Sequence, residues 1–309
     1  MDFLSPASLG EALAAKADHP GAVPIAGGTD VMVEINFGMR RPDALLDLNR
    51  IGELAETGRD GAELHVGAGV SYARIISEAG GDLPGLAMAS RTIGSPQIRN
   101  RGTAGGNLGA ASPAGDTHPV LLACDAVIEA VSARGSRLIP AAAFYAGPKR
   151  SVLEADELIA AIRIHPADGP QQFAKIGTRN AMVIAVCSFA LALWPRGRPA
   201  RAGATGTTPD DAQRTVGTGI GSAGPVPLPA TAAEDFLSGE LAASGLWESR
   251  RPLPATVISR FGELVAGAAR PIDDVRGTAA YRRHALSVLA RRTLGWAWDD
   301  YLREAAGCA

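Results

Sequence analysis

The sequence contains few of the residues that usually bind metals or act as catalytic side chains. Only 3 cysteines and 5 histidines occur among its 309 residues, and Cys124, Cys187 and Cys308 are too far apart for a CxxC pattern. We therefore expect this chain to hold neither zinc nor an iron–sulfur cluster. A P-loop, a GxSxG elbow and an HExxH helix are also missing, so we expect no catalytic side chain. Any chemistry of this chain should then be supplied by a bound cofactor.

The sequence also lacks a strong charge of either sign and a membrane-spanning run. The formal net charge is −2, which leaves no basic face for nucleic acid or an anionic membrane. The longest apolar run, residues 181–194, is shorter than the roughly 20 residues that span a bilayer. The sequence shows no secretory signal. We therefore expect a cytoplasmic chain with no transmembrane segment.

Glycine, in contrast, is abundant, with 37 residues. Two pairs, Gly27-Gly28 and Gly105-Gly106, share one layout, in which short polar residues lie beside the glycines. Successive backbone N–H groups in a glycine-rich turn can bind a phosphate group. Two such turns suit a ligand with two phosphates and two polar ends, and the alternative is that both are structural turns. Because residues 95–109 show no clear hydrophobic periodicity, we expect the second pair to lie in a loop.

Local patterns predict the main helices and strands. Ser5 followed by proline predicts a helix over residues 5–17 that Ser5 caps. A long helix should begin near Thr278 and bury one apolar face. That face is expected to carry Tyr281, Ala285, Val288 and Leu289. Strands are expected at residues 127–131, 137–139, 157–164 and 181–193.

The two glycine motifs also resemble those of a known family. Ala26-Gly27-Gly28-Thr29-Asp30 and Thr103-Ala104-Gly105-Gly106-Asn107 are similar to the paired AGGxx and TxGGN motifs of the FAD-binding medium subunit of molybdenum hydroxylases. This family includes xanthine dehydrogenase and carbon monoxide dehydrogenase. The resemblance spans nearly the whole chain, and further similar segments lie at residues 96–102, 111–116, 157–164 and 269–278, with Tyr281-Arg282.

The resemblance implies an α+β fold with FAD lying between domains. It predicts a two-subdomain FAD-binding domain of the vanillyl-alcohol oxidase (PCMH-like) type, followed by a C-terminal α+β domain of the CO dehydrogenase flavoprotein kind. A linker-like run at residues 165–170 marks the expected boundary. The two domains are therefore expected at residues 1–168 and 171–309.

The resemblance also implies which residues bind FAD. Residues 24–31 would wrap the pyrophosphate and residues 103–107 would support it. Asp116 would bond the ribityl or flavin end, Ile159 would offer a backbone contact to the adenine side, and Lys175 would lie near the polar edge of the cofactor. Ile93 and Leu108 would contact the rings or belong to the core. The full set is Pro24, Ile25, Ala26, Gly27, Gly28, Thr29, Asp30, Val31, Ile93, Thr103, Ala104, Gly105, Gly106, Asn107, Leu108, Asp116, Ile159 and Lys175.

Some positions depart from the family pattern. Thr29-Asp30 stand where some relatives carry His-Ser, so the hydrogen bonds of that loop can differ. Residues 181–183 stand where others carry Gly-Asp-Tyr, so no aromatic is assured over the flavin. Tyr145 is open to two interpretations, a cover for the flavin or an anchor in the core. The cysteine-rich insertion that some relatives carry for an extra iron–sulfur cluster is absent.

The function implied is that of an electron-transfer subunit in a heterotrimeric molybdenum hydroxylase. FAD on this chain would take electrons from [2Fe-2S] clusters on a small partner and pass them to NAD, a quinone or oxygen. A large partner would carry the molybdenum cofactor, and the assembly is expected to be a dimer of heterotrimers. Such a chain would not act on substrate alone. Two alternatives stay open, a self-contained flavin oxidase or reductase of the same superfamily and a non-catalytic scaffold subunit.

Overall fold

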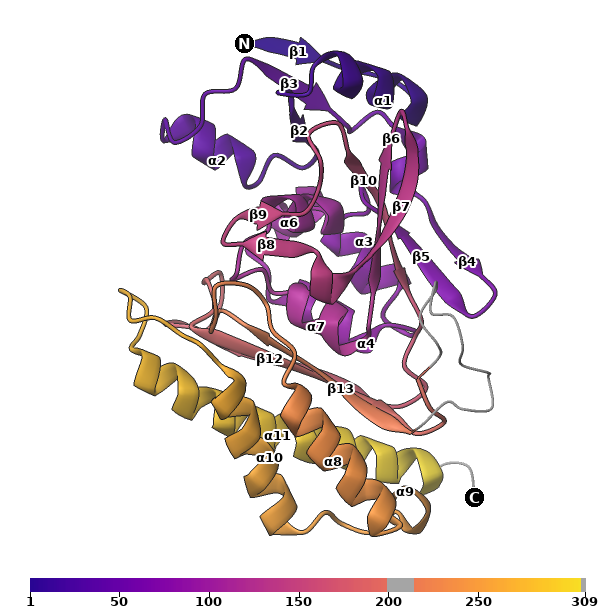
Figure 1. Cartoon of the computed structure of the whole chain (residues 1–309), viewed down its shortest axis with the longest axis vertical. Helices are drawn as coiled ribbons and strands as arrows, with labels where there is room; N and C mark the ends of the chain where they lie inside the picture. The colour runs from indigo at the N-terminus through magenta and orange to yellow at the C-terminus, as the bar shows by residue number, and fades with distance from the viewer. Residues whose placement is uncertain (199–213, 307–309) are drawn as a thin grey trace.

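The computed structural model describes residues 1–198 and 214–306. Figure 1 shows three layers stacked along the long axis, each built on its own sheet. The N-terminal layer is a small parallel sheet with strand order β1-β3-β2. Its elements are β1 (Asp2–Leu4), α1 (Leu9–Asp18), β2 (Val23–Ile25), α2 (Val31–Asn36) and β3 (Ala44–Asp47), and the short 3-10 helix η1 (Gly52–Ala55) follows.

Helix α1 begins later than its sequence pattern predicts. Ser8, and not Ser5, is the cap, because its Oγ accepts a hydrogen bond from Glu11 N at 3.2 Å. The Glu11 carboxylate in turn accepts the Ala7 N–H at 2.8 Å. This reciprocal pairing satisfies two backbone donors at the start of the helix. The expectation that Ser5 caps this helix was wrong for that reason.

The middle layer is an antiparallel sheet with strand order β4-β5-β10-β6-β7 and a group of short helices against it. Strands β6, β7 and β10 confirm three of the predicted strands. The elements are β4 (Thr57–Asp60), β5 (Glu63–Gly67), α3 (Tyr72–Glu78), α4 (Pro84–Arg91), α5 (Pro96–Arg101), α6 (Ala104–Ala110), α7 (His118–Ala123), β6 (Val127–Ser132), β7 (Gly135–Pro140), η2 (Ala141–Ala143), β8 (Tyr145–Gly147), β9 (Arg150–Ser151) and β10 (Leu158–Ile164).

The segment that holds the second glycine pair is helical, so the prediction of a loop was wrong. Ser95 Oγ accepts from Ile98 N and begins α5, and Thr103 Oγ1 accepts from Gly106 N at 2.9 Å and begins α6. Each helix starts on a side-chain cap. With six and seven residues, α5 and α6 are too short to show a hydrophobic period in the sequence.

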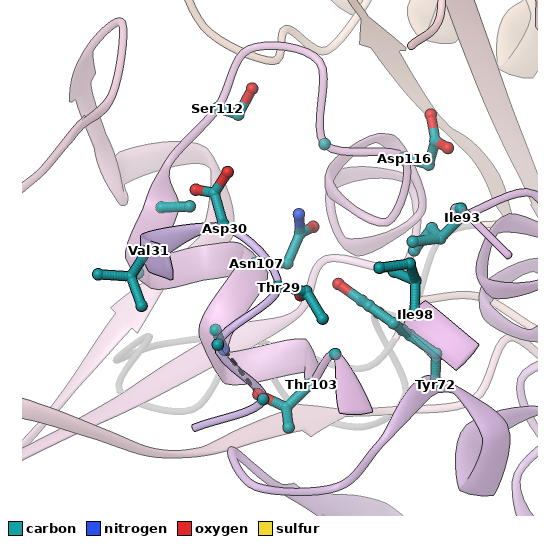
Figure 2. Close-up of a pocket in the computed structure, with 18 of the residues that line it drawn as sticks. Thr29, Asp30, Val31, Tyr72, Ile93, Ile98, Thr103, Asn107, Ser112 and Asp116 are labelled. Carbon is teal, nitrogen blue, oxygen red and sulfur yellow. Dashed lines mark hydrogen bonds between the residues drawn. The ribbon is translucent and has the colours of Figure 1, made fainter. Parts of the chain in front are cut away.

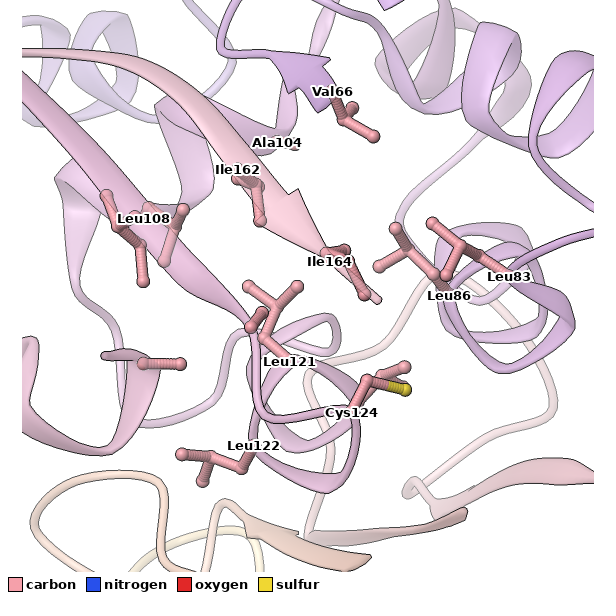
Figure 3. Close-up of a cluster of buried hydrophobic side chains, with 14 of the residues drawn as sticks. Val66, Leu83, Leu86, Ala104, Leu108, Leu121, Leu122, Cys124, Ile162 and Ile164 are labelled. Atoms are coloured by element: carbon pink, nitrogen blue, oxygen red, sulfur yellow. The ribbon is translucent and has the colours of Figure 1, made fainter. Parts of the chain in front are cut away.

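The main core fills the space between this sheet and its helices. Figure 3 shows Leu108 of α6, Leu121 of α7 and Ile162 of β10 within this cluster of buried side chains. Phe173 and Ala190, which follow the predicted domain boundary, belong to the same cluster. The middle layer and the C-terminal layer therefore share a core, and the division into domains at residues 168–171 stays a prediction.

The C-terminal layer is an antiparallel sheet of strand order β11-β12-β13, covered on its outer face by helices. Alternate residues of β12 belong to two different cores, with Ala190 facing the middle layer and Phe189 facing the helices. Such double burial explains why this strand is a continuous apolar run. The elements are β11 (Gln171–Ile176), β12 (Cys187–Trp194), β13 (Thr215–Gly221), α8 (Thr231–Ala243), α9 (Leu246–Ser249), α10 (Ala255–Ala268) and α11 (Ala279–Ala306).

Two predictions for this layer need correction. The strand expected over residues 181–193 begins only at Cys187, because residues 181–186 form a loop that reaches the site described below. Helix α11 begins where the pattern predicts, but Tyr281 is exposed. Arg282 is buried in its place, since its guanidinium donates to Val186 O at 2.9 Å and to the Asp274 carboxylate.

Residues 1–198 and 214–306 contain neither a membrane-spanning helix nor a cluster of metal-binding side chains. No helix there has the length and hydropathy to cross a bilayer. No group of three or more His, Cys, Asp or Glu side chains there is arranged to hold a metal ion. Cys124 and Cys187 are buried free thiols, and Cys308 lies outside the described residues.

Candidate cofactor-binding site

A cavity of about 610 Å³ opens between the N-terminal layer, helices α5 and α6, and the loop before β12. Its volume is within the roughly 300–1,000 Å³ range typical of ligand and cofactor sites. Figure 2 shows side chains from both glycine motifs on its walls. The predicted residues that line it are Ala26, Gly27, Gly28, Thr29, Asp30, Val31, Ile93, Thr103, Gly106, Asn107 and Asp116.

A smaller, mostly apolar cavity of about 100 Å³ adjoins the first one. The two share Ala26, Gly106 and Gly109 as lining residues. Three further predicted residues, Pro24, Gly105 and Ile159, line this smaller cavity. Together the two cavities form one elongated site that passes along helix α6.

The first glycine motif is the turn between β2 and α2, and each glycine is needed for a different reason. Gly28 has φ +72°, a left-handed conformation that glycine adopts without strain. A Cβ on Gly27 would lie 1.8 Å from the carbonyl oxygen of Arg101. The turn therefore packs directly on the end of α5, and only glycine allows this approach.

The second glycine motif is the first turn of α6, and its two glycines face opposite ways. Gly105 is buried, and a Cβ there would lie 2.4 Å from the Cβ of Ala68. Gly106 and Gly109 are exposed, lie one turn apart and line the cavity. Gly105 thus lets α6 pack on the loop after β5, while Gly106 and Gly109 leave bare backbone along which a flat ligand can lie.

Asp116 lines the cavity and has one buried carboxylate oxygen without a hydrogen-bond partner. Its Oδ2 accepts from Lys175 Nζ at 2.5 Å and from Thr92 Oγ1 at 3.0 Å, whereas the buried Oδ1 has no hydrogen-bond partner. Burial raises the pKa of the Asp116 carboxyl, and the Lys175 ammonium opposes that shift. A buried acceptor without a donor is costly. The arrangement therefore suits an N–H or O–H group of a ligand.

Lys175 supports the Asp116 carboxylate from the side away from the cavity lining. Its side chain is 10% exposed and also donates to the carbonyl oxygens of Thr92 at 2.9 Å and Val183 at 3.2 Å. It lines neither cavity, so its geometry is that of a support for the Asp116 carboxylate. Because Lys175 lies on β11, this ion pair joins the C-terminal layer to the wall of the site.

A few predicted residues lie away from the cavities. Ala104 and Leu108 lie in the core beneath α6, at 1% and 0% exposure, because their face of the helix packs on the sheet. Ile25 lines neither cavity. Tyr145 is bonded through its hydroxyl to His118 Nδ1 at 2.7 Å, at the edge of the core. The structure thus gives Tyr145 the place of an anchor and not of a cover.

The structure adds site residues that no sequence pattern indicates. Figure 2 shows the Tyr72 ring lying along the cavity with its hydroxyl toward Thr29. Burial raises the pKa of Tyr72, so its hydroxyl stays protonated at neutral pH. Glu34 and Lys149 also line the cavity although 115 residues separate them. Only the fold brings these residues together, and no spacing in the sequence could have indicated them.

Fold and site together define an α+β protein with an elongated, backbone-lined site suited to a large cofactor. Residues 1–167 match the family described as the FAD binding domain in molybdopterin dehydrogenase. Residues 173–297 match the CO dehydrogenase flavoprotein C-terminal domain. The chain belongs to this family and is a FAD-binding medium subunit of molybdenum hydroxylase-type dehydrogenases.

Individual relatives agree with the family assignment. The chain is 34% identical to the nicotinate dehydrogenase FAD-subunit of Eubacterium barkeri over 202 residues, or 62% of this chain and 68% of that one. It is 29% identical to the nicotine 6-hydroxylase medium subunit of Paenarthrobacter nicotinovorans, over 94% and 95% of the two chains. A solved carbon monoxide dehydrogenase from Hydrogenophaga pseudoflava matches with a TM-score of 0.83 at 26% identity, over 97% and 98%.

These comparisons confirm the family resemblance and the α+β fold class. The chain is a flavoprotein subunit of an oxidoreductase, and its cofactor is FAD. The site fits that cofactor on two structural grounds. Asp116 Oδ1 is a buried acceptor without a donor, and α6 exposes bare backbone along the cavity.

Proposed function

We propose that this chain is the electron-transfer subunit of a heterotrimeric molybdenum hydroxylase in the cytoplasm. It would receive electrons from [2Fe-2S] clusters on a small partner subunit and deliver them to an external acceptor. A large partner subunit would hold the molybdenum cofactor and hydroxylate the substrate, with two heterotrimers in the assembly. The names of the relatives support this proposal, since they describe FAD and medium subunits of dehydrogenases and hydroxylases.

The observation that carries the proposal is the meeting of the two glycine motifs on the walls of one site. Bound FAD supplies redox chemistry that protein side chains lack. In the proposed arrangement, residues 24–31 and 103–107 hold the pyrophosphate through backbone and short polar groups. Asp116 Oδ1 accepts a hydrogen bond from the ribityl or ring end, with Lys175 fixing the carboxylate. Ile159, in the smaller cavity, contacts the adenine side.

Reduction of the flavin tests the proposal against the self-contained oxidase. The purified full chain should bind one FAD, seen as flavin absorbance that stays with the protein during gel filtration. In the complex purified from its host, the substrate should bleach this absorbance, and metal analysis should find iron and molybdenum on the partner chains. The isolated chain should not be bleached. A flavin that the substrate reduces in the isolated chain would overturn the proposal.

A further inference from the structure

Helix α2 lines the cofactor site but is held by little packing against the rest of the protein. None of its six residues is buried, and Val33 is 45% exposed. Phe37, which follows the last residue of α2, is 77% exposed. A helix of this length is not stable by itself in water. Figure 1 shows α2 standing away from the β1-β3-β2 sheet, with the β8-β9 hairpin on the side toward the middle layer. The position of α2 therefore depends on the contacts that it makes with other segments.

Within the described ranges, a single hydrogen bond joins α2 to a distant segment. Lys149 Nζ donates to Glu34 Oε1 at 2.6 Å. The second carboxylate oxygen, Oε2, accepts from Arg40 Nη1 at 3.5 Å, but Arg40 belongs to the same arm of the chain. The bond from Lys149 lowers the pKa of Glu34, so the carboxylate is ionised at neutral pH. The side chain of Glu34 is 19% exposed and that of Lys149 is 55% exposed.

Lys149 is fixed in place by its backbone. It lies in the turn between β8 and β9 with φ +55°, and its N–H donates to Ala111 O at 3.1 Å. Ala111 ends helix α6, the helix that exposes Gly106 and Gly109 to the cavity. Lys149 is thus attached to the packed wall of the site, while Glu34 is attached to the weakly supported wall.

We propose that Glu34 and Lys149 are positioning residues that close the site by holding α2 over the bound FAD. Both residues line the same cavity as Thr29 and Asn107. Their ion pair therefore joins the two walls between which the cofactor lies. The inference rests on the proposed function, because it requires FAD to occupy this cavity. Breaking the pair frees α2 and gives the cofactor a faster route out.

A competing explanation is that Lys149 attracts the phosphates of FAD directly, with Glu34 merely reducing that attraction. The two explanations differ in sign. If the pair acts as a closure, Glu34→Gln and Lys149→Met both speed FAD release. If Lys149 acts alone on the phosphates, Glu34→Gln slows release and Lys149→Met speeds it. The charge-swapped double variant E34K/K149E separates the two explanations further. It re-forms an ion pair between positions 34 and 149, so it should restore slow release if the pair closes the site.

The experiment measures FAD release from the full chain, as the rise in free-flavin fluorescence after dilution to a concentration at which released FAD does not rebind. Each single variant should release FAD about fivefold faster, which is the upper range for an exposed pair. E34K/K149E should return to within about twofold of the wild-type rate. Glu263→Gln, which breaks the exposed Arg260–Glu263 pair in α10, is the matched control and should change nothing.

Melting temperatures of the apo-variants show whether a variant releases FAD faster because the site opens or because the chain unfolds. If a single variant melts early, the double variant still tests the inference. Unchanged release rates in both single variants would overturn the inference, and so would rates that move in opposite directions. Failure of the wild-type chain to retain any FAD would instead overturn the proposed function. The two failures are therefore distinguishable.

Discussion

Both walls of the site contain a Gly-Gly motif, but the helices that follow the two motifs differ in how much of their surface is buried. The second motif opens α6, whose inner face belongs to the main core through Ala104 and Leu108. The first motif leads into α2, which buries no residue. The wall formed by α6 is therefore rigid. The wall formed by α2 depends on an ion pair and on the bound cofactor to hold its position. We expect substitutions in the rigid wall to lower stability, and those in the weakly supported wall to change cofactor exchange.

The largest expected effect is on the rigid wall. Gly105→Ala places a Cβ 2.4 Å from that of Ala68 and 2.6 Å from its carbonyl oxygen, so α6 has to shift. Overpacking of this kind costs about 3 kcal/mol. Urea unfolding of the apo-chain should show this loss. An unchanged midpoint of unfolding would mean that α6 can shift away from Ala68 at no cost and is therefore not rigid.

The neighbouring glycine should give the opposite result. Gly106→Leu points toward the cavity, where the nearest atom to a new Cβ is Thr103 Oγ1 at 3.0 Å. The apo-chain should keep nearly its full stability, and FAD affinity should fall about a hundredfold, or about 2.8 kcal/mol. Titration with FAD followed by flavin fluorescence measures this effect. Unchanged flavin content in this variant would favour the non-catalytic scaffold.

Asp116 should affect binding with a smaller magnitude. Asp116→Ala removes the unpartnered acceptor, and a hydrogen bond to a charged group is worth about 1.5–3 kcal/mol, so affinity for FAD should fall at least about tenfold. Lys175→Met should weaken binding in the same direction, because it leaves the buried carboxylate without its cation. If Asp116→Ala binds FAD as the wild type does, Asp116 does not contact the cofactor.

Acid should destabilise the middle layer through His118, a buried side chain of α7 that is bonded to Tyr145. Burial lowers the pKa of this side chain to about 3, from an ordinary value of 6.5. The neutral form is therefore the folded one, and its contribution to stability is complete above pH 6.5 and is lost as the pH falls toward 3. The slope from this group is at most about 1.4 kcal/mol per pH unit. In His118→Gln, the free energy of apo-chain unfolding should depend less on pH across this window.

Sequence reasoning succeeded where the signal is local or repeated. The apolar patterns predict strands β6, β7 and β10 and the start of α11. The two glycine motifs predict most of the cavity-lining residues that were expected. It failed where packing decides between local options. Ser8 outcompetes Ser5 because Glu11 completes its cap, and α5 and α6 are too short for a period to be seen.

Other features of the site have no local signal. Tyr72, Glu34 and Lys149 meet only because three segments far apart in the sequence fold onto one cavity. Ala285 and Leu289 lie on the buried face of α11 as predicted, but Tyr281 does not. Arg282 is buried there because it finds carbonyl and carboxylate partners in the interior, which an apolar pattern does not reveal. Such residues become predictable only when the tertiary structure is known.

Hydrogen exchange of the full chain with and without FAD tests the difference between the two walls most directly. FAD should strongly slow exchange in residues 25–36. Residues 104–110 should already exchange slowly without FAD and should change little when it binds. Equal exchange of both segments in the apo-chain, or protection by FAD confined to residues 104–110, would show that the two walls do not differ in this way.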